Sequence, residues 1–241
     1  MNTESQVIIV QGLQVEVIRK DIKNLHLAVY PPNGRVRIAV PLHVNDAAVR
    51  LAVINKLRWI KTRRERFEAQ PRQSEREMSQ GESHYFLGAR YRLRIVGGAG
   101  ETGIVKGEKR LELHEKSPKT QAQRDRILQE WYRERLKELV PGFLEKWEKK
   151  LGVQVKAWGI RKMKTRWGSC NPFSGRILLN LELIKTPVEC LEYIVVHELL
   201  HLRERLHNDR FLKLMNRYLP QWRFLRDELN RSPLGHVNWE Y

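Results

Sequence analysis

Residues 186–207 read TPVECLEYIVVHELLHLRERLH and contain the pattern His-Glu-x-x-His at positions 197–201. Thr186, followed by proline and then by Glu189, predicts the start of a helix, because threonine caps helices and proline favours the first helical position. Apolar residues flank the pattern on both sides, which is typical of a buried helix. We therefore expect a helix whose interior positions hold both histidines.

The spacing of the pattern indicates a metal site. Residues four apart project from one face of a helix, so His197 and His201 can bind one ion. Catalytic zinc takes nitrogen ligands at about 2.0–2.1 Å and keeps one position open for water. Glu198 is placed to act on that water as a general base without being a ligand. The pattern thus predicts two ligands and a catalytic carboxylate for a single zinc ion.

A third histidine follows at a spacing that suits the same ion. His207 lies six residues after His201, which gives the pattern His-Glu-x-x-His-x5-His. Metzincins place a glycine midway between such ligands to turn the chain, and Glu204 stands there in this sequence. We expect the helix to end near residues 206–208, with Asn208 or Asp209 capping the next helix. His207 would then reach the metal from the helix end.

An inert zinc site with four protein ligands is the alternative for the same histidines. Cys190 lies two helical turns from His197, too far to complete the tetrahedron, whereas Cys170 is able to approach from elsewhere in the fold. We also consider Glu182 and Asp209 as partners that orient the histidines. These assignments remain open at the level of sequence.

The pattern along the chain predicts an α+β protein with a boundary near residue 117. A mostly-β region, residues 1–117, precedes a helical domain, residues 118–241, that holds a small sheet and the metal pattern. Short β-branched runs and turn signals such as Asn33-Gly34 indicate the strands, and residues 46–69 show helical periodicity. We expect strands at 7–10, 13–18, 25–30, 36–40, 85–87, 91–96, 111–113, 153–160 and 177–179, and helices at 46–69, 121–150, 187–208, 209–218 and 221–230. Pro141 is expected to interrupt the long helix.

The composition excludes several classes of protein, among them disulfide-rich and membrane-spanning ones. The chain has 241 residues with 45 Lys and Arg against 28 Asp and Glu, a formal net charge of +17. Two cysteines exclude a disulfide scaffold and fit a reducing compartment. Since no apolar run reaches about 18 residues and the start lacks a signal peptide, we expect a cytoplasmic protein without a membrane segment.

The excess positive charge is concentrated in two segments, residues 58–66 and 156–176. The second contains six Lys and Arg and no acidic residue. Such segments predict a polyanionic partner, nucleic acid or nucleotide, beside a protein or peptide substrate. A strand here is able to bind an extended substrate by strand addition, with Gly168 allowing close approach. The residues expected to contact the substrate are Arg166, Trp167, Gly168, Ser169 and Asn180.

Taken together, these residues resemble the YgjP-like zinc metallopeptidase family, which is similar in outline to the SprT-like zinc proteases. The resemblance rests on residues 166–170, residues 177–180, Pro187, the pattern at 197–202, and on His207 and Phe211. It implies a zincin-like domain with His197, His201 and His207 as zinc ligands and Glu198 as the catalytic acid/base. The positions before the third histidine and after the phenylalanine, where the family often has Asn and Trp, hold Leu206 and Leu212 here.

Three functions remain compatible with this reading. The first is zinc-dependent hydrolysis of peptide bonds. The second keeps the metal but uses a nucleoside triphosphate such as UTP, an activity linked to the family, although residues 97–100 lack the Lys-Ser/Thr of a phosphate loop. The third is a DNA-associated protease acting on DNA-bound proteins. A degenerate site without activity is least compatible, because all three histidines and Glu198 are retained.

Overall fold

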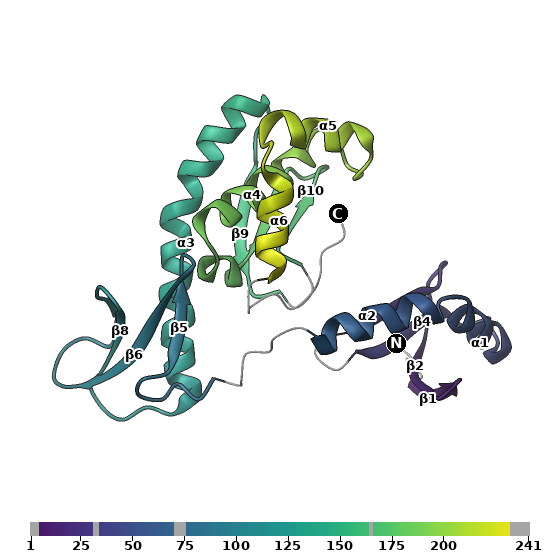
Figure 1. Cartoon of the computed structure of the whole chain (residues 1–241), viewed down its shortest axis with the longest axis horizontal. Coiled ribbons are helices and arrows are strands. Elements are labelled where there is room, and N and C mark those ends of the chain that lie inside the picture. The colour runs from purple at the N-terminus through teal and green to yellow at the C-terminus, as the bar shows by residue number, and fades with distance from the viewer. Residues whose placement is uncertain (1–4, 31–33, 70–75, 164–165, 232–241) are drawn as a thin grey trace. The chain divides into compact units, whose positions relative to one another are not determined.

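The computed structural model describes residues 5–30, 34–69, 76–163 and 166–231, with the backbone alone for 66–69. The described residues form two compact units, one up to residue 69 and one from residue 76 onward (Figure 1). Helices and three small mixed sheets occur in the described residues, which confirms the predicted α+β class. None of the described helices is long and apolar enough to cross a bilayer.

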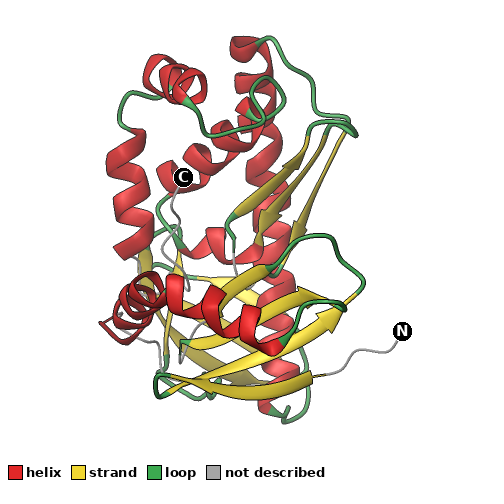
Figure 2. Cartoon of the chain, turned by 90° about the vertical axis from the view of Figure 1, so that its right-hand side faces the viewer, coloured by secondary structure: helices red, strands yellow, loops and turns green. Residues whose placement is uncertain are grey.

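The first unit is a four-stranded sheet covered by two helices. Its apolar core joins alternate strand residues, such as Val15 and Ile38, to Val49, Val53 and Ile60 of the helices. Figure 2 shows helices and strands in separate colours. The strand order is β1-β2-β4-β3, and the elements are β1 (Ser5–Val10), β2 (Leu13–Lys20), β3 (His26–Tyr30), β4 (Arg35–Pro41), α1 (Asp46–Asn55) and α2 (Leu57–Ala69). The predicted turn residues 31–33 lie outside the described residues.

The helix predicted over residues 46–69 is two helices. Asn45 caps the first as expected, because its side-chain oxygen accepts a hydrogen bond of 2.9 Å from the Ala48 N–H. The helical backbone ends at Lys56, whose φ is −109° and ψ is 8°. This break lets α1 contact β1 at one edge of the sheet while α2 contacts β3 at the other.

The second unit begins with a sheet that repeats the connectivity of the first. The strands are β5 (Ser83–Phe86), β6 (Ala89–Gly97), β7 (Gly103–Lys106) and β8 (Arg110–Glu115), in the order β5-β6-β8-β7. In both sheets the two central strands are parallel and both outer pairs are antiparallel. The first hairpins also share a turn type, because Gln11-Gly12 and Leu87-Gly88 all have positive φ. The topology therefore repeats although the sequence shows no repeat.

Helix α3 (Gln121–Leu151) connects this sheet to the rest of the second unit (Figure 1). The predicted capping box is confirmed, since the Thr120 side chain and the Gln123 side chain each bond the other's backbone N–H. The prediction that Pro141 interrupts the helix is wrong. Val140 and Leu144 are buried on either side of it, so packing maintains the helix at the loss of one backbone bond.

The remaining elements form a three-stranded sheet and a group of helices. The sheet has the order β10-β11-β9, with β10 antiparallel and β9 parallel to β11. The elements are β9 (Ala157–Arg161), β10 (Gly168–Asn171), β11 (Arg176–Asn180), the 3-10 helix η1 (Leu181–Lys185), α4 (Val188–Leu200), α5 (Asp209–Tyr218) and α6 (Trp222–Arg231). Strand β9 is shorter than the run predicted over residues 153–160.

The compact units do not divide at residue 117, where the sequence indicated a boundary. Strands β5–β8 share one hydrophobic core with α3 and α4, in which Leu93 and Leu113 belong to the same cluster as Leu136 and Leu199. The composition changes near residue 117, but the packing continues across it. The assignment of the hydrolase function to residues 118–241 stays a prediction.

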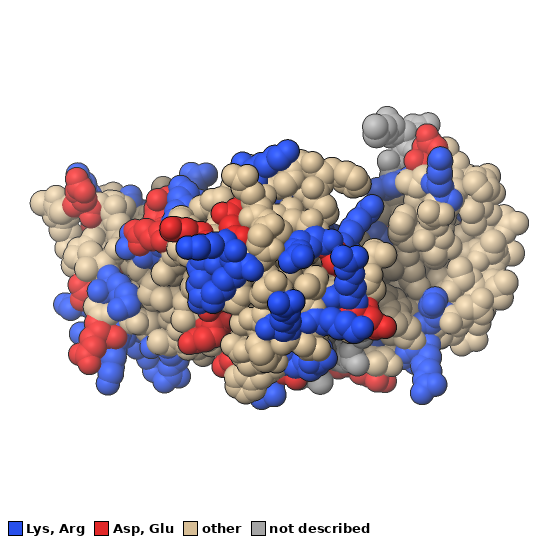
Figure 3. Space-filling view, turned by 90° about the horizontal axis from the view of Figure 1, so that it is seen from above, with Lys and Arg blue, Asp and Glu red and all other residues tan. Residues whose placement is uncertain are grey.

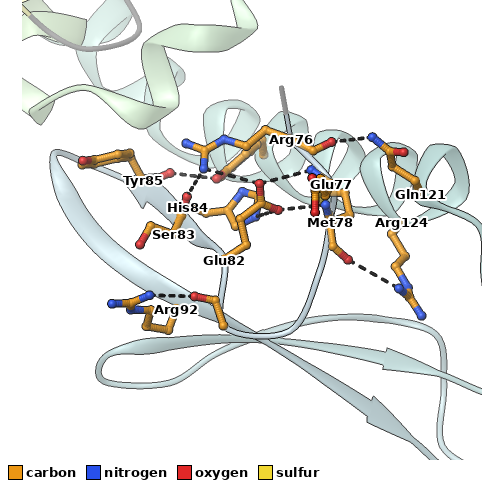
Figure 4. A network of polar contacts seen from close by, with 12 residues as sticks. Arg76, Glu77, Met78, Glu82, Ser83, His84, Tyr85, Arg92, Gln121 and Arg124 are labelled. Carbon is orange, nitrogen blue, oxygen red and sulfur yellow. Dashed lines mark hydrogen bonds and ion pairs between the residues drawn. The ribbon is translucent and has the colours of Figure 1, made fainter. Parts of the chain in front are cut away.

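Polar contacts attach the segment before β5 to β5 and α3 (Figure 4). The Glu82 carboxylate accepts hydrogen bonds from the Met78 N–H, at 2.8 Å, and lies 3.2 Å from Nε2 of the buried His84. Arg124 of α3 donates to the Met78 carbonyl and to both carboxylate oxygens of Glu115 on β8, at 2.9 and 3.1 Å. These contacts join the sheet to the helix that leads towards α4.

Replacing Arg124 with alanine should destabilise the protein in a pH-dependent way. It removes both bonds to the buried Glu115 carboxylate, so we expect the free energy of unfolding to fall by about 1–3 kcal/mol at pH 7. Arg124 holds the pKa of Glu115 below its usual value. The stabilisation is therefore present above the unfolded pKa of about 4.3 and is lost as the pH falls through the folded pKa.

Urea denaturation at pH 7 and at pH 3 measures the difference in the free energy of unfolding between the wild type and the Arg124 variant. Arg94→Ala is the matched control, because Arg94 forms an ion pair with Glu112 on the same sheet with half of its side chain exposed. We expect that control to cost less than about 1 kcal/mol. An Arg124 variant as mild as the control at pH 7 would contradict the assigned role.

Candidate metal centre

Three histidines meet at the carboxyl end of α4. The Nε2 atom of His197 lies 3.1 Å from Nε2 of His201 and 3.0 Å from Nε2 of His207. His197 is buried in α4, His201 follows the last residue of that helix, and His207 lies just before α5. The three candidate donor atoms all lie within 4.8 Å of one another.

The donor set fits a metal ion. A tetrahedral zinc with Zn–N bonds of 2.0–2.1 Å separates two ligand nitrogens by about 3.3 Å, close to the spacings found here. The other ring nitrogen of His201, Nδ1, donates a hydrogen bond of 3.1 Å to the carbonyl oxygen of Glu204. This bond leaves the Nε2 lone pair of His201 for a metal, the usual role of a carbonyl behind a ligand histidine.

The electrostatic environment keeps the three imidazoles neutral. Burial, followed by the neighbouring imidazoles, lowers the pKa of His197 well below its usual value and that of His207 to about 4. Burial also lowers the pKa of His201. Since the neutral imidazole is the form that binds metal, the cluster presents ligands rather than positive charges at neutral pH.

The path of the chain between the ligands differs from the prediction. Helix α4 ends at Leu200 rather than near residues 206–208. The N–H groups of Leu202 and Arg203 bond the carbonyls of Leu199 and Leu200 at 3.0 and 2.9 Å. The chain therefore leaves the helix in a tight turn that brings His207 back to His197.

The caps around this helix are partly as predicted. Asn208 caps α5, accepting a bond of 3.0 Å from the Phe211 N–H. The prediction that Thr186 caps α4 is wrong. The Thr186 hydroxyl donates to the Leu183 carbonyl, at 2.8 Å, and Pro187 is the residue before the helix. The hydroxyl thus closes η1, which turns the chain directly into α4.

Phe211 packs against all three histidines, a role that the sequence patterns did not assign. Its ring centroid lies 4.9, 4.8 and 4.9 Å from those of His197, His201 and His207. It is 1% exposed on the first turns of α5, and it stacks on His201 at 24°. Its position four residues after His207, next to the α5 cap, was the available signal.

The carboxylate of Glu198 lies against the backbone of β10. A Cβ atom placed on Gly168 would stand 2.7 Å from Cγ and 2.8 Å from Cδ of Glu198, closer than side-chain atoms tolerate. Gly168 thus permits the contact between α4 and β10. Burial raises the pKa of Glu198 to about 8, while the positive charge of Arg166 acts in the opposite direction. Such a carboxyl is suited to exchanging a proton near neutral pH.

A cavity of about 610 Å³ opens beside the histidines and Glu198. Its walls come from β10, from the turn that follows it, and from the segment between α4 and α5. The lining residues include Arg166, Gly168, Cys170, Phe173 and Arg205. A cavity of this size accommodates part of an extended peptide or a nucleotide.

Three of the five residues predicted to contact substrate line this cavity: Arg166, Gly168 and Ser169. Trp167 does not, because it is 2% exposed and belongs to the hydrophobic core. Asn180 is also buried, and its amide binds the Met163 backbone and the Arg166 carbonyl, the latter at 2.9 Å. Asn180 therefore positions the segment that carries Arg166 rather than facing a ligand.

The suggested fourth ligand, Cys170, and the suggested outer partners, Glu182 and Asp209, stay predictions. Cys170 lines the cavity, but its sulfur is not among the converging donor atoms of the described residues. Glu182 forms an ion pair with Lys185 at 2.7 Å, and Asp209 occupies the first turn of α5. For His201, the acceptor behind the ring is the Glu204 carbonyl.

The two basic segments belong to different units. Residues 58–66 lie in α2 of the first unit, and residues 156–176 run from before β9 to β11 in the second; Lys164 and Thr165 lie outside the described residues. Figure 3 shows Lys and Arg side chains over one face with acidic side chains among them. A nucleic-acid or nucleotide partner stays a prediction.

A protein family and a solved structure are similar to this chain. A family model described as "YgjP-like, metallopeptidase domain" matches residues 23–232. Among solved structures, the metallopeptidase zymogen abylysin of Pyrococcus abyssi is similar over 38% of this chain and 91% of its own, with 25% identity and a TM-score of 0.36. No curated protein matches the chain.

The histidine cluster predicts that metal stabilises the folded protein. We expect the chelated protein to regain one equivalent of Zn²⁺ and to gain about 2.7 kcal/mol when free zinc is one hundred times the Kd. His197→Ala and His201→Ala should lose both effects. Metal analysis and thermal melts with and without zinc measure them.

His114→Ala is the control, because His114 is half-buried on β8 beside Glu112 and outside the cluster. It should bind and respond to zinc like the wild type. A zinc response that survives in the His197 and His201 variants would place the metal elsewhere.

Proposed function

Because the chain belongs to the YgjP-like metallopeptidase family, we propose that it is a zinc-dependent peptidase whose active site is the cluster at the end of α4. His197, His201 and His207 would hold one Zn²⁺, and Glu198 would be the catalytic acid/base. The observation that carries the proposal is the convergence of three imidazole nitrogens beside a buried carboxylate in an open cavity.

The chemistry divides between the ion and the chain. When bound, Zn²⁺ supplies Lewis acidity, which polarises a substrate carbonyl and makes water a stronger acid. Glu198 accepts the proton of the attacking water and passes it to the nitrogen of the departing amine. Burial of Glu198 between α4 and β10 keeps its carboxylate in one position and, by raising its pKa, makes it a stronger acceptor of the proton.

Strand β10 offers a binding edge for an extended substrate. It is an outer strand of its sheet in the described residues. The Asn180 N–H donates to the Trp167 carbonyl at 2.8 Å, which makes these two residues a hydrogen-bonded pair. The alternation of antiparallel pairing then directs the backbone groups of Gly168 and Cys170 to the open edge. A peptide is able to pair with them by strand addition.

Two other substrates keep the same centre. A nucleoside triphosphate would use the arginines of the cavity, and a DNA-bound protein would bring DNA to the basic segments. The metallopeptidase family favours a protein or peptide substrate. The experiments below therefore test the nucleotide as an alternative substrate.

Replacing Glu198 with glutamine should abolish turnover while zinc stays bound. The amide keeps the shape of the side chain but accepts no proton, so we expect kcat to fall by at least about 100-fold. Cleavage of an unfolded protein such as casein and of short peptides measures activity, and metal analysis measures zinc. Glu189→Gln, on the exposed first turn of the same helix, is the control and should keep full activity. Full activity of the Glu198 variant would disprove the mechanism.

Replacing Gly168 with alanine should separate catalysis from metal binding. The new methyl group would displace the Glu198 carboxylate, and we expect kcat/KM to fall at least about tenfold, as misplaced catalytic groups do. The zinc content should not change, because no ligand lies on β10. Gly142→Ala in α3 is the control, since nothing lies within 4 Å of its added Cβ. A Gly168 variant as active as this control would contradict the close contact.

A further inference from the structure

The walls of the cavity carry two arginines, Arg166 and Arg205, and both are exposed. Of the described residues that line the cavity, Glu198 is the single acidic one. No described acidic side chain forms an ion pair with either arginine. Since guanidinium groups bind carboxylates through paired hydrogen bonds, both remain available to a ligand.

The arginines stand at opposite ends of β10. Arg166 precedes the strand by two residues, and the Asn180 amide bonds its carbonyl oxygen, which positions this end. Beyond the other end, the guanidinium carbon of Arg205 lies 5.6 Å from the ring centroid of Phe173. The binding edge of β10 therefore runs between two positive groups.

Hydrogen bonds and a ring contact fix the structure at the end of β10 near Arg205. The Asn171 side chain accepts bonds from the Phe173 and Ser174 N–H groups, at 3.1 and 3.2 Å, and so shapes the turn between β10 and β11. This turn exposes 84% of Phe173 to solvent. Its ring supports the Arg205 side chain at the mouth of the cavity, which reduces the entropy lost when the arginine pairs with a ligand.

We propose that the cavity selects peptide segments with acidic side chains on both sides of the cleaved bond, read by Arg166 at one end of β10 and by Arg205 at the other. The proposal rests on the peptidase function proposed above. A strand paired with β10 would place side chains near both ends while its central carbonyl faces Glu198 and the three histidines.

The same charges suit phosphate groups, but the cavity favours a peptide. The open backbone edge at Gly168 and Cys170 pairs with another backbone and has no counterpart in a nucleotide. The described lining residues include no run of backbone N–H groups from a glycine-rich loop, the usual phosphate cradle. The nucleotide is therefore an outcome of the test.

Three peptides that differ only in the residues flanking the cleaved bond test the proposal. Mass spectrometry of a casein digest supplies the cleaved frame, and the flanking residues are then Glu, Gln or Lys. For the zinc-loaded wild type we expect kcat/KM for the Glu peptide to exceed that for the Gln peptide about threefold to tenfold, as for partly exposed ion pairs. This ratio should shrink from 50 mM to 500 mM salt.

Charge reversal identifies the residues that read the peptide. Arg166→Glu and Arg205→Glu should each lower the Glu/Gln ratio, and the double variant should prefer the Lys peptide. Arg205→Gln should give an intermediate ratio. Lys213→Glu is the control, because Lys213 is exposed on α5 and outside the cavity lining while the change in charge is the same. It should keep the wild-type ratio.

Binding of the same peptides to the zinc-loaded Glu198→Gln variant separates the two proposals. Stronger binding of the Glu peptide without wild-type turnover would refute the peptidase function and keep the acidic preference. Turnover with equal rates for the Glu and Gln peptides would keep the peptidase and overturn the preference. Release of pyrophosphate from UTP that both arginine reversals abolish, without any peptide preference, would assign the arginines to phosphate and also overturn it.

Discussion

Burial of α4 on nearly every side is the constraint on which the candidate site depends. Ten of its thirteen residues are buried, and the helix contacts α3, α5, α6, β10, β11 and η1. Each fully buried aliphatic side chain contributes roughly 1.5–3 kcal/mol, so the helix has little freedom to shift or rotate. His197 and Glu198, at its carboxyl end, share this rigidity, and the contacts with Phe211 and with β10 add to it.

The rigid helix also explains why a carboxylate is tolerated in the interior. Burying Glu198 is costly, because the charged form loses its hydration, and the cost is visible in its raised pKa. Gly168 lets β10 pass close enough to enclose the carboxylate, and Arg166 supplies a nearby positive charge. The same strand then presents its open edge to the cavity. One contact between a helix and a strand thus encloses the carboxylate and also forms the edge at which we propose that an extended ligand binds.

Local signals in the sequence predicted local structure well. The caps at Asn45, Thr120 and Asn208 are all present, because a side chain that bonds an N–H three residues away needs no distant partner. The errors occur where packing competes with such signals. Thr186 caps η1 instead of α4, Pro141 fails to break α3, and α4 ends at Leu200. In each case a buried neighbour or a turn outweighs a preference of about 1–3 kcal/mol.

The sequence by itself determined the family and the α+β class, and it pointed to the three histidines and to Glu198 as the proposed metal ligands and general base. Only the tertiary structure decided which nearby residues face the site. It buried Trp167 and Asn180, which the basic segment had suggested as ligand contacts, and it brought Phe211 and Arg205 to the histidines and the cavity. It also repeated one sheet topology in two unrelated sequences and carried the second sheet into the core shared with α4. The physical reason is range: helical spacing and capping act over three or four residues, whereas burial depends on neighbours from the whole chain.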